Sequence, residues 1–327
     1  MSNEKSLAAK KAKKNEFYTQ WSSIQKEING YLEYDPNVFK GKTILLPCDD
    51  PDWSNFTKFF AKNFENFGLK KLISTSYALE SKQYEFDFNK KSIENSDLKY
   101  DKVKSKTKGK VFILDKDISG DGKIDIDDLK WDYLEGDGNF SSPEVKKLRD
   151  ESDIIITNPP FSEFINFVSW IMEANKKFLI LGNIESASTK ECFNYIKNNK
   201  MWLGLVANEA VEFEVPNNYE AQREDEDGNK YVTVPKISWF TNLIHGRKSE
   251  GLSGMMSMDD NIKFNKDYKR ALNKGVGPYQ IYQNYNAMEV SYASLVPLDY
   301  DGVMGVPVTF LKKYSAEQFQ IVGMCEN

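Results

Sequence analysis

An apolar, β-branched run that two prolines stop abruptly stands at Asp153-Ile154-Ile155-Ile156-Thr157-Asn158-Pro159-Pro160-Phe161. Runs of this composition form parallel strands that are buried on both faces of a sheet. Proline has no backbone N–H to give to a neighbouring strand, so pairing must end at these two residues. Asn158 is therefore predicted to lie at the carboxyl end of a strand, which is where open α/β sheets bind their ligands.

The residues after this strand suit chemistry on an amino group. The side-chain oxygen of Asn158 and the carbonyl of Pro159 or Pro160 can accept hydrogen bonds from one –NH2 group. Phe161 offers an aromatic face beside them, on which a planar base can stack. This set directs the nitrogen lone pair at a sulfonium methyl, which predicts methyl transfer to an exocyclic amine with these four residues as the catalytic set. The alternative is a strand that ends in an ordinary turn.

The composition indicates a globular protein with a large core. Its 327 residues are 40% hydrophobic, which is enough for one α/β domain and a second region. The apolar runs are far shorter than the ~18 residues that a membrane span needs, and the Lys-rich N-terminus has no apolar signal segment. We therefore expect a cytoplasmic protein with no membrane partner. Three scattered cysteines and a single histidine, His245, argue against a disulfide framework, a zinc site and a Ser-His-Asp triad.

The net charge of −5 at first argues against a nucleic-acid partner. Two short segments hold the excess of acid, however: residues 115–128 carry net −4 and residues 220–230 carry net −3, so the rest sums to about +2. Residues 236–274 hold eight Lys or Arg against four acids, and residues 279–292 add four Tyr. Interleaved basic and aromatic residues suit contacts with DNA backbone and bases, although an ordinary solvated surface has the same composition.

Short apolar runs alternate with amphipathic segments along the first two thirds of the chain. Strands are predicted at residues 42–47, 70–77, 111–114, 153–157, 177–183 and 202–206, and helices at 21–33, 56–67, 143–151, 163–175 and 188–199. Such alternation predicts a parallel sheet with helices on both faces, the Rossmann-like α/β class. Residues 208–245 are expected to form hairpins around an acidic loop.

We divide the chain into three parts. Residues 1–14 hold five Lys and one Glu and are expected to be a flexible basic arm, which either contacts DNA or is a solvated tail. Residues 15–206 form the predicted catalytic domain, with an insertion at about 80–130 that begins as a polar segment with little periodicity. Residues 207–327 form a predicted target-recognition region that partly completes the sheet.

Phe17-Tyr18-Thr19 precedes the first helix and looks like the N-terminal cofactor-pocket motif of amino-methyltransferases. Many of those proteins have proline at the next position, where this chain has Gln20. The resemblance implies that Phe17, Tyr18 and Thr19 line a cofactor pocket. The alternative is an aromatic pair in the core.

The first βα loop, Cys48-Asp49-Asp50-Pro51-Asp52-Trp53-Ser54-Asn55, is acidic and has no glycine motif. Ser54 is placed to cap the helix that follows. Four residues of this loop are predicted to bind the cofactor, the acids at its amino group or ribose: Asp49, Asp50, Pro51 and Asn55. The two acids can instead serve only to cap the helix.

Two later loops are expected at the same edge of the sheet. Thr75 lies near the tip of the second strand, which commonly reaches the cofactor ribose or adenine. Asp137 and Phe140 precede the strand at 153–157, and at that position an acid accepts from the adenine amino group while an aromatic ring packs on the base. Together with Asn158 they complete the predicted cofactor set.

A separate acidic segment follows the pattern of a calcium-binding loop. Aspartate or serine stands at the first, third, fifth and twelfth positions of the pattern, with Gly122 at the sixth. The candidate ligands are Asp117, Ser119, Asp121, Asp125 and Asp128. A strand rather than a helix precedes the loop, and a solvated acidic loop is the alternative. Calcium is not expected to be required for catalysis.

With these residues in place, the chain resembles the EcoRI-type adenine-specific DNA methyltransferases over nearly its whole length. The matching segments are residues 16–20, 48–51 with 54–56, 68–73, 136–138 with Phe140, 157–161, 239–243 with 245–246, and 299–307. A glycine-free acidic first loop is characteristic of that family. The acidic segment at 115–128 is not among its motifs.

The resemblance implies a site-specific DNA adenine-N6 methyltransferase that uses S-adenosylmethionine and recognises double-stranded DNA with its C-terminal region. A stacked adenine is out of reach, so the base is expected to flip into the pocket above residues 158–161. Two alternatives stay open: an amino-methyltransferase that acts on RNA or a protein amide, and a non-catalytic DNA-binding protein on a methyltransferase scaffold. The sequence indicates neither the recognised DNA sequence nor the oligomeric state.

Overall fold

The computed structural model describes residues 18–51, 54–78, 100–215, 219–249, 254–275 and 277–325. The predicted basic arm at residues 1–14, the cofactor candidate Phe17 and residues 79–99 of the predicted insertion lie outside the described residues. No helix in the described part of the chain combines the length and the apolar character that crossing a membrane requires.

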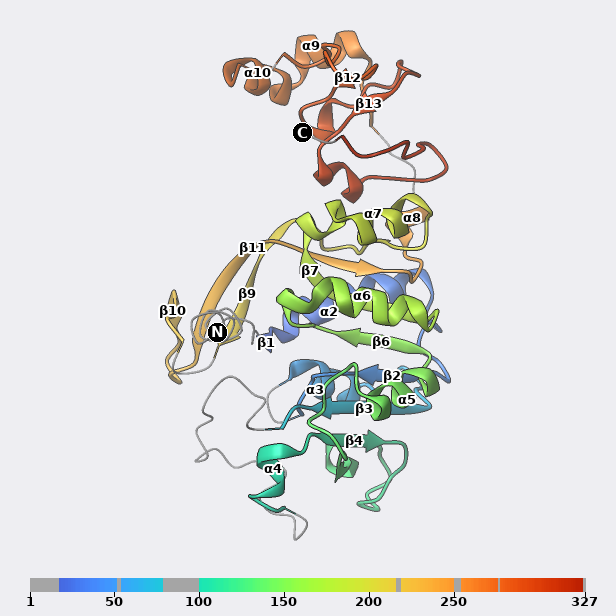
Figure 1. The fold of residues 1–327 in the computed structure, drawn as a ribbon, viewed down its shortest axis with the longest axis vertical. Helices are drawn as coiled ribbons and strands as arrows, with labels where there is room; N and C mark the ends of the chain where they lie inside the picture. The colour runs from blue at the N-terminus through green and yellow to red at the C-terminus, as the bar shows by residue number, and fades with distance from the viewer. Residues whose placement is uncertain are drawn as a thin grey trace, which may run out of the picture.

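One sheet organises the described part of the chain (Figure 1). Its eleven strands are β1 (Tyr18–Thr19), β2 (Thr43–Leu46), β3 (Lys71–Ser76), β4 (Lys110–Leu114), β5 (Lys130–Tyr133), β6 (Ile154–Thr157), β7 (Lys177–Asn183), β8 (Trp202–Leu203), β9 (Glu209–Val215), β10 (Arg223–Glu224) and β11 (Lys230–Thr241). The spatial order is β1-β9-β11-β7-β6-β2-β3-β4-β5, while β8 and β10 pair with β11. The strand that precedes Asn158 thus lies between β2 and β7.

The centre of the sheet is parallel and its flanks are antiparallel. β2, β3, β6 and β7 run in one direction, with Ile44 beside Ile154 and Thr157 beside Ile180. β4 runs antiparallel to β3, β5 runs antiparallel to β4, and β7 and β8 both run antiparallel to β11. The prediction of a parallel sheet over residues 42–206 was therefore right for β2, β3, β6 and β7 and wrong at β4. Antiparallel neighbours need no crossover helix, and α4 (Lys104–Thr107), between β3 and β4, is a single turn.

Several of the helices begin at a residue whose side chain caps them. The remaining α-helices are α2 (Trp21–Tyr34), α3 (Asn55–Lys62), α5 (Pro143–Glu151), α6 (Phe164–Glu173), α7 (Lys190–Lys197), α8 (Gly246–Ser249), α9 (Met258–Phe264) and α10 (Lys266–Asn273). Short 3-10 turns are η1 (Ile126–Asp128), η2 (Phe161–Glu163), η3 (Ile184–Ser188), η4 (Ala293–Leu295) and η5 (Val308–Lys312). The Ser54 side chain accepts from the N–H of Phe56, as its predicted capping role requires. α3 ends at Lys62, before the predicted residue 67, and the chain then turns through Gly68, whose φ is +60°.

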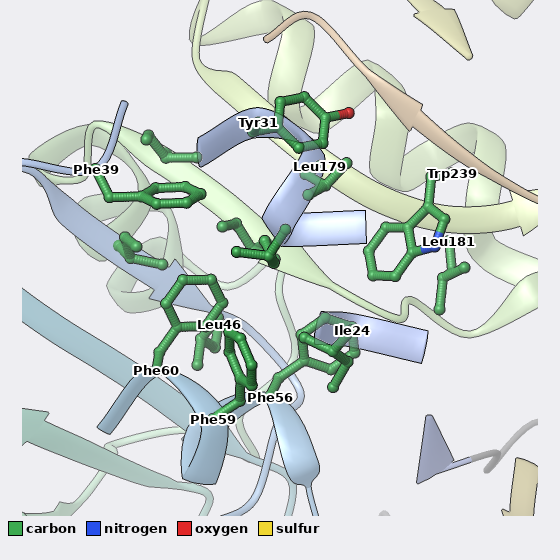
Figure 2. Packing of buried hydrophobic residues seen from close by; sticks show 14 of the residues in the cluster. Ile24, Tyr31, Phe39, Leu46, Phe56, Phe59, Phe60, Leu179, Leu181 and Trp239 are labelled. Carbon is green, nitrogen blue, oxygen red and sulfur yellow. The ribbon is translucent and has the colours of Figure 1, made fainter. Parts of the chain in front are cut away.

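Two apolar clusters cover the opposite faces of the sheet. Ile154 and Ile156 belong to the first cluster, while Ile155 belongs to the second, because successive strand residues point to opposite faces. Figure 2 shows the first cluster, in which the aromatic residues of α3 gather with Tyr31 of α2 and Trp239 of β11. The aromatic stripe of α3 is therefore core, as its spacing indicated. α5, α6 and α7 supply the helical residues of the second cluster.

The described residues after α8 pack as a smaller region that lies past α7 at the top of Figure 1. It contains α9, α10 and two short parallel strands, β12 (Met288–Glu289) and β13 (Met304–Gly305). Its own apolar cluster consists of Met288, Val290, Leu295, Val296 and Phe310. Three of its side chains, those of Val308, Leu311 and Ile321, pack on the second sheet cluster. This region is therefore joined to the sheet by apolar contacts as well as by the chain.

Candidate active site

The turn after β6 is held by its own prolines. Asn158 follows Thr157, the last residue of the strand, and Pro159 is buried directly behind it. Pro160 is extended, with φ at −53°, and η2 begins at Phe161. The Phe161 ring is half-buried, and its centroid lies 6.3 Å from that of Phe213 in an edge-on arrangement. The four predicted catalytic residues thus form one compact turn at the carboxyl end of a central parallel strand.

The first βα loop is tied to this turn through a buried carboxyl group. Asp49 is 5% exposed, and its Oδ1 accepts a hydrogen bond from Ser54 Oγ at 2.6 Å. Its other oxygen, Oδ2, lies 2.5 Å from Thr157 Oγ1, which also lies 2.8 Å from the carbonyl oxygen of Pro47. Burial raises the pKa of Asp49 to about 7. Both oxygens of this predicted cofactor ligand therefore have protein partners.

The rest of the loop is fixed against β3. Thr75, one of the predicted cofactor residues, is buried and its hydroxyl accepts from the backbone N–H of Cys48 at 3.2 Å. Cys48 has a left-handed backbone, with φ at +67°, and the hydroxyl of Thr75 supports that turn. The carbonyl of Asp50 accepts from the N–H of Ser54 at 2.7 Å, and Pro51 is buried. Asp50 therefore stands at the start of α3, half-exposed at the sheet edge.

The N-terminal motif joins the same edge although it comes from a distant part of the sequence. β1 pairs with β9, which places Thr19 beside Phe213, the residue that the Phe161 ring contacts. The side-chain amide of Asn55 donates to the carbonyl oxygen of Thr19 at 2.9 Å. Thr19 is thus joined to the first βα loop by Asn55 and lies beside the residue that contacts Phe161, while the cofactor pocket itself stays a prediction.

Two polar atoms of this N-terminal motif are buried without a hydrogen-bond partner among the described residues. They are the hydroxyl oxygen of Thr19 and the side-chain nitrogen of Gln20. An unsatisfied buried polar atom is costly, so atoms of this kind indicate a place where a bound molecule supplies the partner. The sequence marked Gln20 only as a departure from the usual proline. Its polarity at a pocket position was the available signal.

The loop before α5 lies against the tip of β3. The carbonyl of Asp137 accepts from the N–H of Ala78 at 2.8 Å, and its carboxylate accepts from the N–H of Asn139 at 3.1 Å. Gly138 has φ at +88°, and a Cβ atom there would lie 2.3 Å from the carbonyl oxygen of Ser76, so only glycine permits this approach. Asp137 is consequently held beside the β3 tip, near the other predicted cofactor residues.

Phe140 is placed differently from Asp137. It is 6% exposed, and its ring lies 5.0 Å from that of Phe167 and 5.6 Å from that of Trp170 in α6. These edge-on contacts make Phe140 part of the second core cluster. Its predicted stacking on the cofactor's adenine stays a prediction.

The acidic segment between β4 and β5 is closed by its own backbone. Asp117 accepts from the N–H groups of Gly120 and Gly122, and Asp128 accepts from those of Ile118 and Ser119. Those bonds lower the pKa of Asp128 to about 2. Asp121 and Asp125 each accept from an N–H two residues further on. Within the described residues, no group of three or more acidic, histidine or cysteine side chains is gathered for a metal ion. Calcium binding here stays a prediction.

These contacts define a class of protein. A Rossmann-like sheet, an Asn-Pro-Pro-Phe turn on a central strand, and an N-terminal aromatic motif at the same edge are the parts of an amino-methyltransferase. In this chain the three parts are joined by Asn55, Phe213 and Asp49.

Comparison with known proteins gives the family. The chain matches the family described as adenine-specific methyltransferase EcoRI over residues 6–327. It is 38% identical over 319 residues to the Type II methyltransferase M.EcoRI of Escherichia coli, which covers 96% of this chain and 87% of that protein. It is also 32% identical to the Type II methyltransferase M.MpnI of Mycoplasma pneumoniae, over 98% of this chain and 85% of that protein. No solved structure matches the chain. The protein belongs to the EcoRI family of adenine-specific methyltransferases.

Proposed function

We propose that this protein transfers the methyl group of S-adenosylmethionine to N6 of an adenine in duplex DNA, at the turn formed by residues 158–161. The observation that carries the proposal is the meeting of Thr19, Asn55 and the Asn158 turn at the carboxyl edge of the parallel strands. Because the relatives are Type II methyltransferases, the methylation is proposed to be specific for one short DNA sequence.

The residues at this edge fit S-adenosylmethionine. The unpartnered hydroxyl of Thr19 and amide of Gln20 offer hydrogen bonds that the described protein residues do not use. Asp50 and Asp137 add half-buried carboxylates, which suit a cationic amino group and the hydroxyls or amine of a nucleoside. When bound, the cofactor supplies an electrophilic methyl on a sulfonium centre. We propose Thr19, Gln20, Asp50 and Asp137 as its principal contacts, with Tyr18, Pro51 and Asn55 forming the wall behind them.

The target base is proposed to enter from the duplex by flipping, at a cost of roughly a few kcal/mol. Asn158 and the carbonyl at Pro159 or Pro160 hold its two N–H bonds, and Phe161 stacks on the ring. The amine nitrogen then bonds to the methyl carbon as the carbon–sulfur bond breaks, and one amine proton leaves to solvent. No covalent intermediate with the protein is needed.

The C-terminal region is proposed to hold the DNA. α10 and the residue after it carry Lys266, Lys269, Arg270 and Lys274 against Asp267, and all four basic residues are exposed. Binding that depends on such residues weakens steeply as salt concentration rises, because each phosphate contact releases counterions. We propose the cytoplasm, where bacterial DNA lies, as the place of action.

Methyl transfer with labelled S-adenosylmethionine tests the proposal. The full chain is incubated with duplex DNA, structured RNA or a cell protein extract, and the labelled product is digested and identified. We expect label only in DNA, as N6-methyladenine, and labelling that is slower by ~10²-fold or more with the Asn158→Ala variant. Label in RNA or in protein amides supports the alternative amino-methyltransferase, and binding of DNA without any transfer supports the non-catalytic alternative.

A further inference from the structure

The buried carboxyl group of Asp49 spans two parallel strands at the predicted active site. Asp49 follows β2, while Thr157 is the last residue of β6 and the immediate neighbour of Asn158. The contact between Asp49 Oδ2 and Thr157 Oγ1, at 2.5 Å, joins residues 108 positions apart. Ser54 Oγ, at 2.6 Å from Oδ1, ties the same carboxyl to the start of α3. One side chain thus fixes the first βα loop and the Asn158 turn relative to each other.

The hydrogen atoms available to this cluster are too few for an ionised Asp49. The Thr157 hydroxyl has one proton, yet its oxygen lies within hydrogen-bond distance of two acceptors, the Pro47 carbonyl and Asp49 Oδ2. If Asp49 is a carboxylate, one of these two short oxygen–oxygen contacts has no hydrogen between the atoms. A proton on Asp49 Oδ2 removes the deficit: Asp49 donates to Thr157, and Thr157 donates to Pro47.

The other half of the carboxyl group agrees with this assignment. Ser54 Oγ accepts from the N–H of Phe56 at 3.1 Å, so its own proton is free to reach Asp49 Oδ1. A neutral carboxylic acid then donates once and accepts once, and every hydroxyl in the cluster is satisfied. We propose that Asp49 works as a protonated positioning residue that holds the Asn158 turn through Thr157, rather than as a carboxylate that binds the cofactor.

The surroundings favour the neutral form. Burial is the largest influence on the pKa of Asp49; the hydroxyls of Ser54 and Thr157 lower it and the charge of Asp50 raises it, and the net result is a pKa of about 7. The groups that face Asp49 from β6 and α3 are hydroxyls, and the Cys48 thiol precedes it in the chain. The inference rests on the proposed active site for its consequence in catalysis, but the protonation of Asp49 does not depend on that proposal.

Two measurements detect the protonation state of Asp49 and do not depend on methyl transfer. In the full chain, the side-chain carboxyl carbon of Asp49, assigned by its disappearance in Asp49→Asn, is followed by NMR from about pH 4 to about pH 9. We expect a titration near neutral pH. The folded acid then binds a proton that the unfolded acid has already lost, so the melting temperature of the parent should fall relative to Asp49→Asn as pH rises towards 7. A carboxyl that titrates near its ordinary value overturns the proposal.

Three variants test the link to the Asn158 turn. Asparagine can donate to Thr157 and accept from Ser54, so Asp49→Asn should bind S-adenosylmethionine within about threefold of the parent and keep its single-turnover rate at about pH 6, where the parent acid is protonated. Thr157→Val removes the hydroxyl and should slow the single-turnover rate by ~10-fold or more at unchanged cofactor affinity, because the turn loses its anchor. Thr157→Ser, the matched control, should restore the rate.

The outcomes separate this inference from the proposed function. A loss of cofactor affinity of more than about tenfold in Asp49→Asn shows a direct ionic contact and overturns the positioning role. If Thr157→Val and Thr157→Ser react equally fast, the strand contact does not position the turn, which also overturns it. If the proton is found but no DNA is methylated by the parent, the proposed function fails while the protonated Asp49 stands.

Discussion

Asp49 at the carboxyl edge of the sheet and Glu27 inside α2 are both buried acids, and they have different kinds of partner. Burial raises the pKa of each to about 7. Asp49 meets the hydroxyls of Ser54 and Thr157, which can donate or accept. Glu27 accepts from the backbone N–H groups of Leu205 at 2.9 Å and Val206 at 2.7 Å, groups that can only donate.

The two clusters are expected to serve different purposes, turnover for the Asp49 cluster and stability for the Glu27 cluster. Glu27 also accepts from Tyr31, whose ring packs edge-on against the buried His245, so this cluster fastens α2 to the segment before β9. The Asp49 cluster, by contrast, ends at the residue beside Asn158. Changes at the sheet edge should therefore alter turnover, while changes in the Glu27 cluster should alter the free energy of unfolding.

The largest effect is expected at Asn158. Asn158→Ala removes one acceptor for the target amine and leaves the prolines in place, so turnover should fall by ~10²-fold or more while the fold and cofactor affinity survive. Single-turnover methylation measures this. Phe161→Ala is the matched comparison: it should also weaken capture of the base, since stacking contributes ~1–3 kcal/mol. A parental rate in Asn158→Ala would mean that the turn is only structural.

Glu27→Gln should lower the free energy of unfolding by about 1–3 kcal/mol, because the amide presents an N–H to a backbone N–H and leaves both unsatisfied. The folded-state pKa of Glu27 is above its ordinary value. The stability that protonated Glu27 contributes is therefore present at low pH and is lost as pH rises through about 7. The difference in the free energy of unfolding between the parent and Glu27→Gln should therefore become smaller between about pH 5 and about pH 8.

Denaturant unfolding at several pH values measures the effect of Glu27→Gln. The control is Glu33→Gln, an exposed acid in the same helix, which should change stability by less than about 0.5 kcal/mol. Equal effects of the two substitutions would contradict the account of the Glu27 cluster. So would a slower methyl transfer step in Glu27→Gln at a temperature where it is fully folded.

Thr19→Val should have a smaller effect, which is confined to the affinity for the cofactor. The hydroxyl of Thr19 has no partner among the described residues, so stability should be unchanged or slightly higher in the variant. The affinity for S-adenosylmethionine should fall by about 2- to 10-fold, which corresponds to the ~0.5–1.5 kcal/mol of one hydrogen bond. Calorimetry gives the affinity, and Thr19→Ser should restore it. Unchanged binding in Thr19→Val would exclude the hydroxyl as a contact.

The smallest effect on catalysis is expected from calcium. The carboxylates of Asp117 and Asp128 already accept backbone N–H bonds, so an ion must compete with them and binding should be weak, on the order of 10⁻³ M. Turnover should be the same with calcium or with a chelator. Calorimetry on the parent and on Asp117→Asn measures binding. Identical heats for the two proteins would show that the loop binds no calcium.

The sequence predicted the catalytic strand and its neighbours well for physical reasons. β6 and β7 are continuous apolar runs, and α5 begins at a serine followed by proline, so pattern and capping chemistry agree. Strand direction was not predictable in the same way. An apolar run such as Lys110–Leu114 has the same composition in either direction, and only the tertiary connection makes β4 antiparallel.

The polar contacts of the site were harder to foresee than its residue types. Asp49 was expected to face the cofactor because acids in such loops commonly do, yet its partner Thr157 lies 108 residues further on. A contact of that separation has no local signature. Thr157 itself had one signal, a hydroxyl at the end of an otherwise apolar β-branched run. Gln20 likewise had only one signal in the sequence, an amide side chain where many amino-methyltransferases have proline.

Sequencing that detects modified bases tests the central claim most directly. DNA is taken from cells without adenine methylation of their own that express either the parent chain or Asn158→Ala. The account predicts N6-methyladenine at one short sequence throughout the DNA from cells with the parent, and far less modified adenine with the variant. Unmodified adenine in cells that contain folded, cofactor-binding parent protein would contradict it, as would equal modification by the two proteins.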